Sequence, residues 1–243
     1  MPGLTDQQRR SFSERGYLAV GRVSAPEHAR MLKEVAGRLL GLDGKPPSLP
    51  ETHLLRATGA DPHVRVALHL CHMNPAFRLN ATSARVAGLV ADLFGEEPAA
   101  LTSLLFHKPP TVGLELGLHQ DLPYYPYLGD QQLITCWTAL DPVDATNGGV
   151  QYVPGSHRGR LPHRQTGQQQ ALDLPEDLVD ASAAHTVALT PGEAVLHHGL
   201  TVHRSAANTS DLPRMGLATL YIPAGVSVHQ DDFPYPPLTP RSR

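Results

Sequence analysis

A histidine and an aspartate two positions apart, His119 and Asp121, are the pair in this chain best suited to bind one metal ion together. Residues two apart on a β-strand point to the same face, so an imidazole and a carboxylate there can approach one cation from one side. A later histidine, His203, could complete a set of two histidines and one carboxylate. Such a set leaves coordination positions open for reactants and is typical of non-haem Fe(II) sites.

The His-x-Asp pattern has little weight by itself, because a chain with 14 histidines should contain about one copy by chance. A second copy, His229-Gln230-Asp231, stands near the C-terminus. It has no histidine after it and lies in a proline-rich stretch, so we interpret it as a coincidence. The residues that surround the first copy are what distinguish it.

The second half of the chain has the residue pattern expected of a β-rich core. After Pro98, apolar runs of a few residues alternate with clusters of Pro, Gly, Asn and Asp. Regular spacing of this kind is typical of sandwiches and jelly rolls. We expect a jelly-roll core, that is, a double-stranded β-helix, over 98–223. A polar segment at 158–183 would be an insert over the barrel mouth, and 224–243 would be a proline-rich tail.

The first 97 residues are richer in helical signals. Helices are predicted at about 5–15, 26–40 and 81–94, with a short strand at 16–20. Thr5 or Asp6 is the expected N-cap of the first helix, Pro26 suits the first turn of the second, and Gly95 should end the third. The prediction is one α+β domain over 1–243, mainly β, with the N-terminal helices of 1–97 packed on one face of the core.

Composition excludes several classes of function. A formal charge of −3 and a pI near 6.5 give no electrostatic case for nucleic acid or an anionic membrane. Cys71 and Cys136 are too few for a disulfide framework and form no CxxC pair. The sequence shows no apolar signal core and no apolar stretch long enough to span a membrane. We therefore expect a cytoplasmic protein that acts on a small molecule.

An ordered series of short motifs surrounds the candidate ligands. The series comprises Lys108-Pro109-Pro110, Leu118-His119-Gln120-Asp121-Leu122, Tyr124-Tyr125-Pro126-Tyr127, Trp137-Thr138-Ala139-Leu140, Asn147-Gly148-Gly149, Val153-Pro154-Gly155-Ser156-His157, His203-Arg204-Ser205 and Arg214. Together these motifs resemble the phytanoyl-CoA dioxygenase family of Fe(II)/2-oxoglutarate oxygenases. The resemblance is clear over about 104–221 and faint before that.

The resemblance implies a role for several of these residues. His119, Asp121 and His203 would be the iron ligands. Arg214 matches the family arginine that binds the distal carboxylate of the cosubstrate 2-oxoglutarate, a task that suits the planar fork of a guanidinium. Ser205 resembles the family serine that donates a hydrogen bond to the same carboxylate.

Three further positions can be compared with the family. Trp137 resembles the family tryptophan that forms an apolar wall beside the cosubstrate. A gapped comparison places Arg65 where the family has a cosubstrate-binding lysine. A family methionine is replaced by a leucine, Leu104, which keeps the apolar volume.

Several residues near these motifs have more than one interpretation. We expect His197 and His198 to support the site or to pack, with His198 and His203 on opposite faces of a strand. His157 should belong to a turn, and Lys108 is interpreted as an exposed strand end. The tyrosines of the Tyr124-Tyr125-Pro126-Tyr127 motif would line the substrate pocket or pack a loop.

The family couples conversion of 2-oxoglutarate and dioxygen to succinate and CO2 with hydroxylation of an unactivated carbon. Family halogenases lack the carboxylate ligand, so Asp121 favours hydroxylation. The substrate, an acyl-CoA or a natural-product intermediate, is left open, and Arg158, Arg160 and Arg164 are candidate contacts for coenzyme A. A jelly-roll metalloenzyme that uses no 2-oxoglutarate and a non-catalytic binding module remain alternatives. The oligomeric state, monomer or homodimer, is also open.

Overall fold

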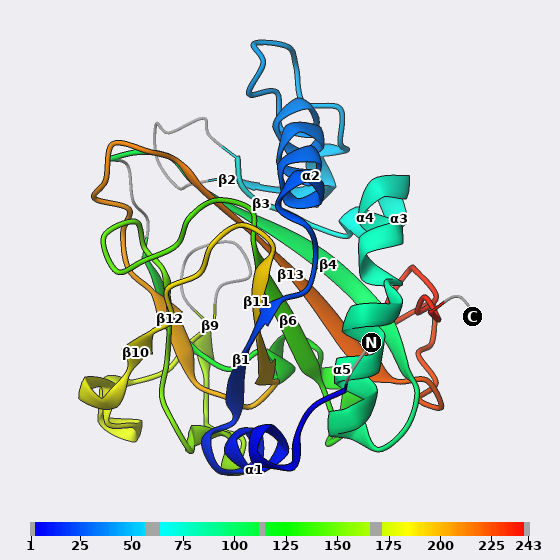
Figure 1. Ribbon diagram of the computed structural model, residues 1–243, viewed down its shortest axis with the longest axis vertical. Coiled ribbons are helices and arrows are strands. Elements are labelled where there is room, and N and C mark those ends of the chain that lie inside the picture. Colours follow the sequence, from blue (N-terminus) through cyan, green and yellow to red (C-terminus); the bar gives the residue numbers. More distant parts are fainter. Residues whose placement is uncertain (1–2, 57–63, 112–114, 166–171, 241–243) are drawn as a thin grey trace.

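Two antiparallel β-sheets form the centre of the protein, as a computed structural model shows for residues 3–56, 64–111, 115–165 and 172–240 (Figure 1). The larger sheet has the strand order β1 (Tyr17–Arg22), β11 (Glu193–His198), β6 (Ile134–Ala139), β13 (Arg214–Pro223), β4 (Pro98–Lys108), β3 (Val64–Ala67) and β2 (Leu54–Arg56). The smaller sheet has the order β10 (His185–Thr186), β7 (Val150–Tyr152), β12 (His203–Ser205) and β5 (Leu116–His119). The prediction of a mixed fold dominated by β-structure is confirmed.

The two sheets pack against each other through one apolar core. Trp137 and Leu220 of the larger sheet belong to the same buried cluster as Val150 and Tyr152 of the smaller sheet. The central strand β13 is buried along its whole length. It is therefore covered on both faces, and a strand covered on both faces is apolar without alternation.

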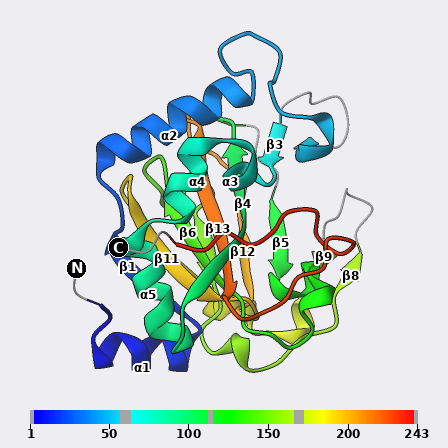
Figure 2. The ribbon, with the colours of Figure 1, turned by 90° about the vertical axis from the view of Figure 1, so that its right-hand side faces the viewer.

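Helices cover the outer face of the larger sheet. They are α1 (Asp6–Arg15), α2 (Pro26–Leu39), α3 (Leu70–Met73), α4 (Pro75–Ala81) and α5 (Ala84–Phe94), and Figure 2 shows α2, α4 and α5 along one side of the sheet. Leu32 of α2 shares a buried cluster with Leu105 of β4 and Leu217 of β13. Leu89 of α5 shares another with Tyr221 of β13. The two faces of β13 thus divide the molecule into a helix layer and a layer between the sheets.

The helix ends follow local chemistry. Thr5 forms a capping box with Gln8 at the start of α1, and Gly95 ends α5 in the left-handed conformation at φ 76°. The predicted single helix at 81–94 is wrong at its start, because Thr82 ends α4 and the Ser83 hydroxyl accepts from the backbone of α5. The short strands β2 and β3 and the one-turn helix α3 were not predicted, since none of them has a periodic pattern long enough to detect.

The polar segment at 158–183 lies beside β5 in its described parts, 158–165 and 172–183; residues 166–171 lie outside the described residues. It contains the short pair β8 (Arg164–Gln165) and β9 (Leu172–Asp173). The Leu174 N–H donates to the Leu118 carbonyl at 2.7 Å, so the segment extends the edge of the smaller sheet. Its role as an insert over the barrel mouth stays a prediction, as do the domain limits.

The proline-rich C-terminal segment packs on the body of the protein as far as it is described. Leu238 and Ala100 exchange two backbone hydrogen bonds, both of 2.8 Å. Phe233 is buried in the core between the sheets. Figure 2 shows this segment (red) crossing in front of β4 and β5.

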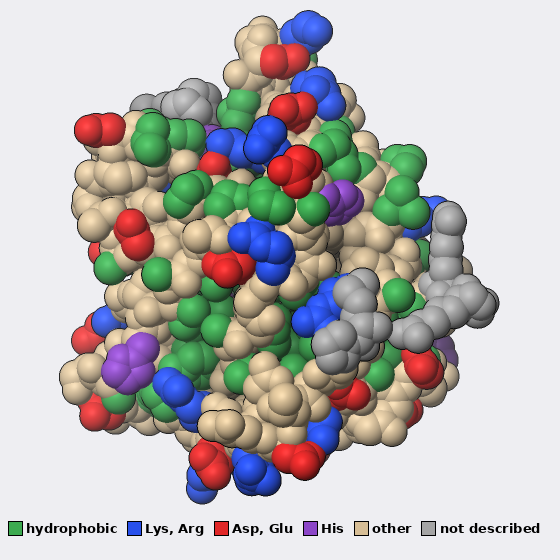
Figure 3. Space-filling view, viewed as in Figure 1, with side chains coloured by type: hydrophobic (Ala, Val, Ile, Leu, Met, Phe, Trp, Pro, Cys, Tyr) green, Lys and Arg blue, Asp and Glu red, His purple; other side chains and the backbone are tan. Residues whose placement is uncertain are grey.

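The molecular surface has no single dominant charge on the face shown in Figure 3, where acidic and basic side chains are interspersed. This agrees with the small net charge of −3. Within the described residues, no helix combines the length and the apolar character that a membrane-spanning segment needs.

A glycine on β13 makes room for the buried tryptophan. A Cβ at Gly216 would lie 2.0 Å from a ring carbon of Trp137. We expect Gly216→Ala to lower the free energy of unfolding by about 1–3 kcal/mol, because the ring must move within a packed core. Urea unfolding measures the change.

Gly88→Ala is the matched control, since a Cβ there meets nothing within 4 Å on the exposed side of α5. It should raise the free energy of unfolding by roughly 0.5–1 kcal/mol, as alanine does in a helix. Equal stability of the two variants would contradict the close packing of Gly216 against Trp137.

Candidate metal centre and its cavity

Two histidines far apart in the sequence are direct neighbours across the smaller sheet. His119 is the last residue of β5 and His203 the first of β12, and their Cα atoms are register partners. Their ring centroids lie 4.1 Å apart. Strand pairing alone therefore brings the two imidazoles together, because side chains directly opposite on paired strands are in contact.

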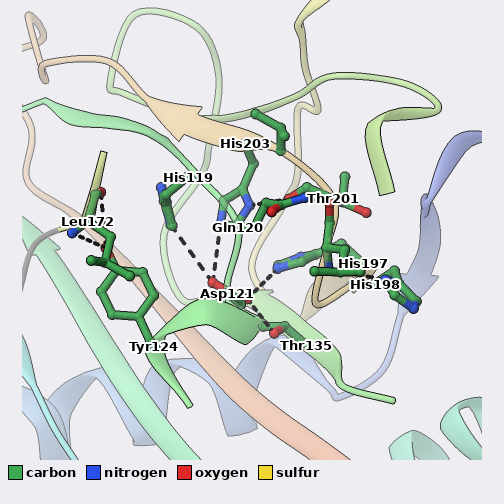
Figure 4. A network of polar contacts seen from close by, with 12 residues as sticks. His119, Gln120, Asp121, Tyr124, Thr135, Leu172, His197, His198, Thr201 and His203 are labelled. Atoms are coloured by element: carbon green, nitrogen blue, oxygen red, sulfur yellow. Dashed lines mark hydrogen bonds and ion pairs between the residues drawn. The ribbon is translucent and has the colours of Figure 1, made fainter. Parts of the chain in front are cut away.

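Asp121 reaches the same point from outside the strand. It follows β5 with a helical backbone (φ −73°, ψ −42°) at the start of the short 3-10 helix η2 (Leu122–Tyr124). The expectation that it shares a strand face with His119 is thus wrong, although the carboxylate still turns toward the imidazoles (Figure 4). Its Oδ1 lies 3.8 Å from His119 Nε2 and 3.6 Å from His203 Nε2.

This set fits a metal ion in distance. One ligand atom from each of His119, Asp121 and His203 lies within 4.8 Å of the others, and no other such group of three His, Cys, Asp or Glu residues occurs in the described parts of the chain. In the second His-x-Asp copy, His229 and Asp231 are both exposed. The interpretation of that copy as a coincidence agrees with this exposure.

The imidazoles are prepared for metal binding by their backbone contacts. His119 Nδ1 donates to the Gly117 carbonyl at 2.8 Å, and His203 Nδ1 donates to the Thr201 carbonyl at 2.9 Å. A carbonyl can only accept, so each neutral ring carries its proton on Nδ1 and presents the Nε2 lone pair to the carboxylate. Burial lowers the pKa of both histidines, which keeps them in the neutral form that a metal requires.

The second oxygen of Asp121 is fixed by two donors. Thr135 Oγ1 donates to Oδ2 at 2.6 Å, and His197 Nε2 donates to it at 2.9 Å (Figure 4). Burial by itself would raise the pKa of Asp121, but His203 and the hydrogen bond from His197 lower it well below its usual range. The carboxylate is therefore ionised, with Oδ1 left available for a cation.

The neighbouring histidines separate into two roles. His197 lies on β11 of the larger sheet and contacts Asp121 directly. His198 instead accepts the Leu200 N–H at Nδ1 and packs near His157, away from the centre. The expectation that His198 and His203 lie on opposite faces of one strand is wrong, because the chain changes from β11 to β12 between them. His157 follows the Gly155 turn, as expected.

A cavity of about 310 Å³ lies between the two sheets and includes the candidate ligands in its wall. Arg214 lines it and is only 1% exposed. The guanidinium lies 5.4 Å from the centre of the Trp137 ring, donates through Nη2 to the Gly148 carbonyl, and has no hydrogen-bond partner at Nε within the described structure. No carboxylate among the described residues lies within ion-pair distance of it. A buried cation without a counter-ion is costly, so this end of the cavity is suited to an anion.

Lys108 adds a second buried cation beside Arg214. The two residues are register partners on β4 and β13. Lys108 Nζ donates to the Ser205 carbonyl at 3.1 Å and to the Ala206 carbonyl. Burial, Arg214 and Arg65 lower the pKa of Lys108 to about 7. The interpretation of Lys108 as an exposed strand end is wrong, and a single lysine before two prolines gives no sequence signal of burial.

The remaining predicted contacts also reach the cavity wall. Ser205 from β12, Trp137 from β6 and Arg65 from β3 are buried there. Tyr124 and Tyr125 line the cavity as well, whereas the ring of Tyr127 packs near that of Phe233. The structure thus brings all seven predicted site residues to one cavity, while their roles stay predictions.

Comparisons with known proteins agree in one family and one fold. The sequence model of the family "Phytanoyl-CoA dioxygenase (PhyH)" matches residues 12–216. Phytanoyl-CoA dioxygenase 1 of Oryza sativa subsp. japonica is 26% identical over 247 aligned residues, covering 88% of each chain. Peroxisomal phytanoyl-CoA dioxygenase of Rattus norvegicus is 23% identical and covers 90% of this chain and 68% of its own length.

Solved structures show the same fold at low identity. EctD from S. alaskensis with 2-oxoglutarate and 5-hydroxyectoine has a TM-score of 0.77 at 21% identity, covering 93% of this chain and 78% of that one. EvdO2 from Micromonospora carbonacea var. aurantiaca complexed with 2-oxoglutarate has a TM-score of 0.71 at 22% identity, covering 93% of each chain. Another EctD structure contains bound Fe.

The His197–Asp121 hydrogen bond generates a first prediction about the centre. We expect His197→Phe to weaken Fe(II) binding by about 10–100-fold, because the donor that holds Asp121 Oδ2 is lost while a ring of similar size remains. Anaerobic titration with Fe(II), repeated with Co(II), measures this affinity. The exposed His229→Phe is the control and should bind metal as the unmodified chain does. Unchanged affinity in His197→Phe would show that His197 only packs.

Proposed function

Because the chain belongs to the phytanoyl-CoA dioxygenase family and is on that ground a non-haem iron, 2-oxoglutarate-dependent oxygenase, we propose that it hydroxylates an unactivated carbon of a small molecule. The observation that carries the proposal is the presence, in one cavity, of the His119–Asp121–His203 set and a buried arginine with no described carboxylate within ion-pair distance. A metal-binding face and an anion-binding end are what an enzyme of this class needs.

The proposal includes a topology and a domain organisation. The two facing antiparallel sheets would form the two halves of a double-stranded β-helix within one domain. Facing sheets with a site in the mouth between them support this interpretation.

The cosubstrate would lie at the cationic end of the cavity. Arg214 would bind the distal carboxylate of 2-oxoglutarate with two parallel hydrogen bonds, and its unpartnered Nε is an available donor. Ser205 would donate its hydroxyl to the same carboxylate. Lys108 and Arg65 would add positive charge, and Trp137 would exclude water from one side.

His119, Asp121 and His203 would hold the iron, and bound iron supplies the activation of dioxygen that attack on a carbon–hydrogen bond requires. The protein contributes geometry and a dry environment. Leu104, Phe106 and Leu220 give the cavity apolar walls.

The lining and the volume of the cavity indicate what size of substrate it can enclose. Arg158, Arg160 and Arg164, the candidate contacts for coenzyme A, are exposed and do not line it. Its volume of about 310 Å³ is at the small end of the range for ligand sites. Both observations favour a small free molecule over an acyl-CoA whose whole length is enclosed.

The decisive experiment compares the Fe(II)-bound protein with and without 2-oxoglutarate. Anaerobic Fe(II) and 2-oxoglutarate should produce a visible charge-transfer band, and air should then produce succinate. A metalloenzyme that does not use 2-oxoglutarate would bind Fe(II) without the band, and a binding module that lost the chemistry would give neither band nor succinate.

Substitution of the aspartate in each His-x-Asp copy tests which copy binds the metal. We expect Asp121→Ala to abolish succinate formation, because the anionic ligand is lost, while Asp231→Ala keeps full activity. Fe(II) titration and succinate release measure both effects. Turnover that survives in Asp121→Ala would contradict the assignment of the ligand.

We expect the affinity for 2-oxoglutarate to depend on the charge and shape of the Arg214 side chain. Arg214→Met should raise the Kd of 2-oxoglutarate by at least about tenfold, and Arg214→Lys should restore only part of the loss because an ammonium cannot form the planar fork. Titration of the charge-transfer band gives the Kd. Equal Kd values for all three proteins would place the carboxylate elsewhere.

A pH dependence follows from the lowered pKa of Lys108, about 7. The charged form attracts a dianion and the neutral form does not, so affinity for 2-oxoglutarate should fall several-fold as pH rises from about 6 to about 9. Lys108→Met should bind weakly with a flat profile over this range. A profile of the same slope in both proteins would assign the titration to another group.

A further inference from the structure

We propose that His69 binds the primary substrate, holding an uncharged small molecule by a carbonyl or hydroxyl oxygen at the end of the cavity opposite Arg214. This inference rests on the proposed function, because it takes the metal side of the cavity as the place of reaction. It assigns a role to a residue that no motif in the sequence marks.

The backbone of His69 is held in an unusual conformation. It adopts φ 60° and ψ 27° between β3 and α3, one of two non-glycine residues with positive φ in the described chain, and the other, Thr111, is exposed. This left-handed conformation is sterically strained for any residue that carries a Cβ. Such strain is concentrated where function requires a particular placement of a side chain.

The imidazole is immobilised by its surroundings. Its Nδ1 lies 3.0 Å from the hydroxyl of Thr102, a fully buried residue of β4. The rings of His53, Phe233 and Tyr235 surround it at centroid distances of 5.2–5.4 Å. Two of these rings come from the C-terminal segment that Figure 2 shows in front of the sheets. A ring fixed in this way can orient a ligand at little entropic cost.

His69 differs from its neighbouring histidines in having a free nitrogen. The Nε2 of His53 is paired with the Tyr235 hydroxyl at 2.8 Å, and the Nε2 of His72 with the Leu101 carbonyl at 2.9 Å. The Nε2 of His69 has no hydrogen-bond partner in the described structure, and of the three histidines it is His69 that lines the cavity. It is therefore the nitrogen available to a ligand.

The register of the larger sheet places His69 relative to the metal centre. Thr102, Leu220 and Thr135 stand side by side on β4, β13 and β6. Thr102 contacts His69, and Thr135 donates to Asp121. Two inter-strand spacings make the separation of the two threonines about 10 Å. A small molecule bound between them would present its carbon–hydrogen bonds to the metal ligands.

The same strand separates this place from the cosubstrate end. Lys108 is the last residue of β4, six residues beyond Thr102 and therefore about 20 Å away along an extended strand. The cavity thus has a cationic end at Lys108 and Arg214 and a second end at His69. An anionic cosubstrate and a neutral substrate would not compete for one place.

The chemistry at the second end favours an uncharged ligand. Burial, with the nearby His53 and His72, lowers the pKa of His69 to about 4, so its ring is neutral at pH 7. The cavity wall beside it is apolar at Leu68, Leu104 and Leu220. One neutral polar nitrogen in an apolar wall recognises a carbonyl or hydroxyl oxygen and disfavours a carboxylate, which would be desolvated without a counter-ion.

Two substitutions at position 69 test the contribution of the His69 Nε2 atom while leaving the fold intact. His69→Asn tolerates the left-handed backbone and keeps an amide near the position of Nδ1, but it has no atom at the position of Nε2. His69→Gln extends an amide to that position. Both variants should form the Fe(II)–2-oxoglutarate charge-transfer band with unchanged Kd, which shows that folding and the proposed function are intact.

Binding is measured by NMR on protein loaded with Zn(II) and 2-oxoglutarate, with cyclohexanone, cyclohexanol, methylcyclohexane and cyclohexanecarboxylate as probes. Cyclohexanone or cyclohexanol should shift the Nε2 resonance of His69 in ¹⁵N-histidine-labelled protein. The same probe should bind His69→Asn about three- to tenfold more weakly, the loss expected for one hydrogen bond, and His69→Gln should recover part of that loss. Methylcyclohexane should bind all three proteins equally.

Each other result overturns the inference. Equal binding of the oxygenated probes to His69→Asn and to the unmodified chain, or no binding of them at all, excludes His69 as the contact. Preferential binding of cyclohexanecarboxylate excludes the neutral substrate class. Absence of the charge-transfer band in the unmodified chain would instead contradict the proposed function itself.

Discussion

The pairing of β5 with β12 is the constraint on which the candidate centre depends. It sets His119 opposite His203, and the helical turn after β5 then directs Asp121 back toward both rings. Each ligand is held by a contact made with its other polar atom: a backbone carbonyl for each imidazole, and Thr135 with His197 for the carboxylate. The donor atoms are thus oriented before any cation arrives, which lowers the cost of binding it.

The two ends of the cavity differ in charge. Arg214 and Lys108 are buried side by side with no described carboxylate within ion-pair distance, and among the described carboxylates only Asp141 and Glu115 act on them at longer range. A bound dianion would stabilise this arrangement. At the other end, burial keeps His69 neutral within apolar walls. One strand, β4, connects the two ends, so the length of an ordinary strand separates the place for an anion from the place for an uncharged molecule.

The chain has fourteen histidines, and those that lie around the cavity in the described structure perform different tasks. Two of them face Asp121 with Nε2, a third supports that carboxylate, and another group forms a ring-stacked wall around His69 with the C-terminal segment. Their surroundings, rather than their frequency, decide which nitrogen is free. The proline-rich tail participates in this wall through Phe233 and Tyr235.

The sequence alone was sufficient for the β-rich class and the helix positions at 6–15 and 26–39, because alternation, capping residues and turn residues act locally. It also singled out His119, Asp121, His203 and Arg214, since an ordered series of motifs keeps its spacing. Only the tertiary structure revealed that Lys108 is buried, that His197 rather than His198 contacts Asp121, and that His69 has a free nitrogen at the cavity wall. Burial and hydrogen-bond partners come from strands distant in the sequence, and no local pattern in the chain records them.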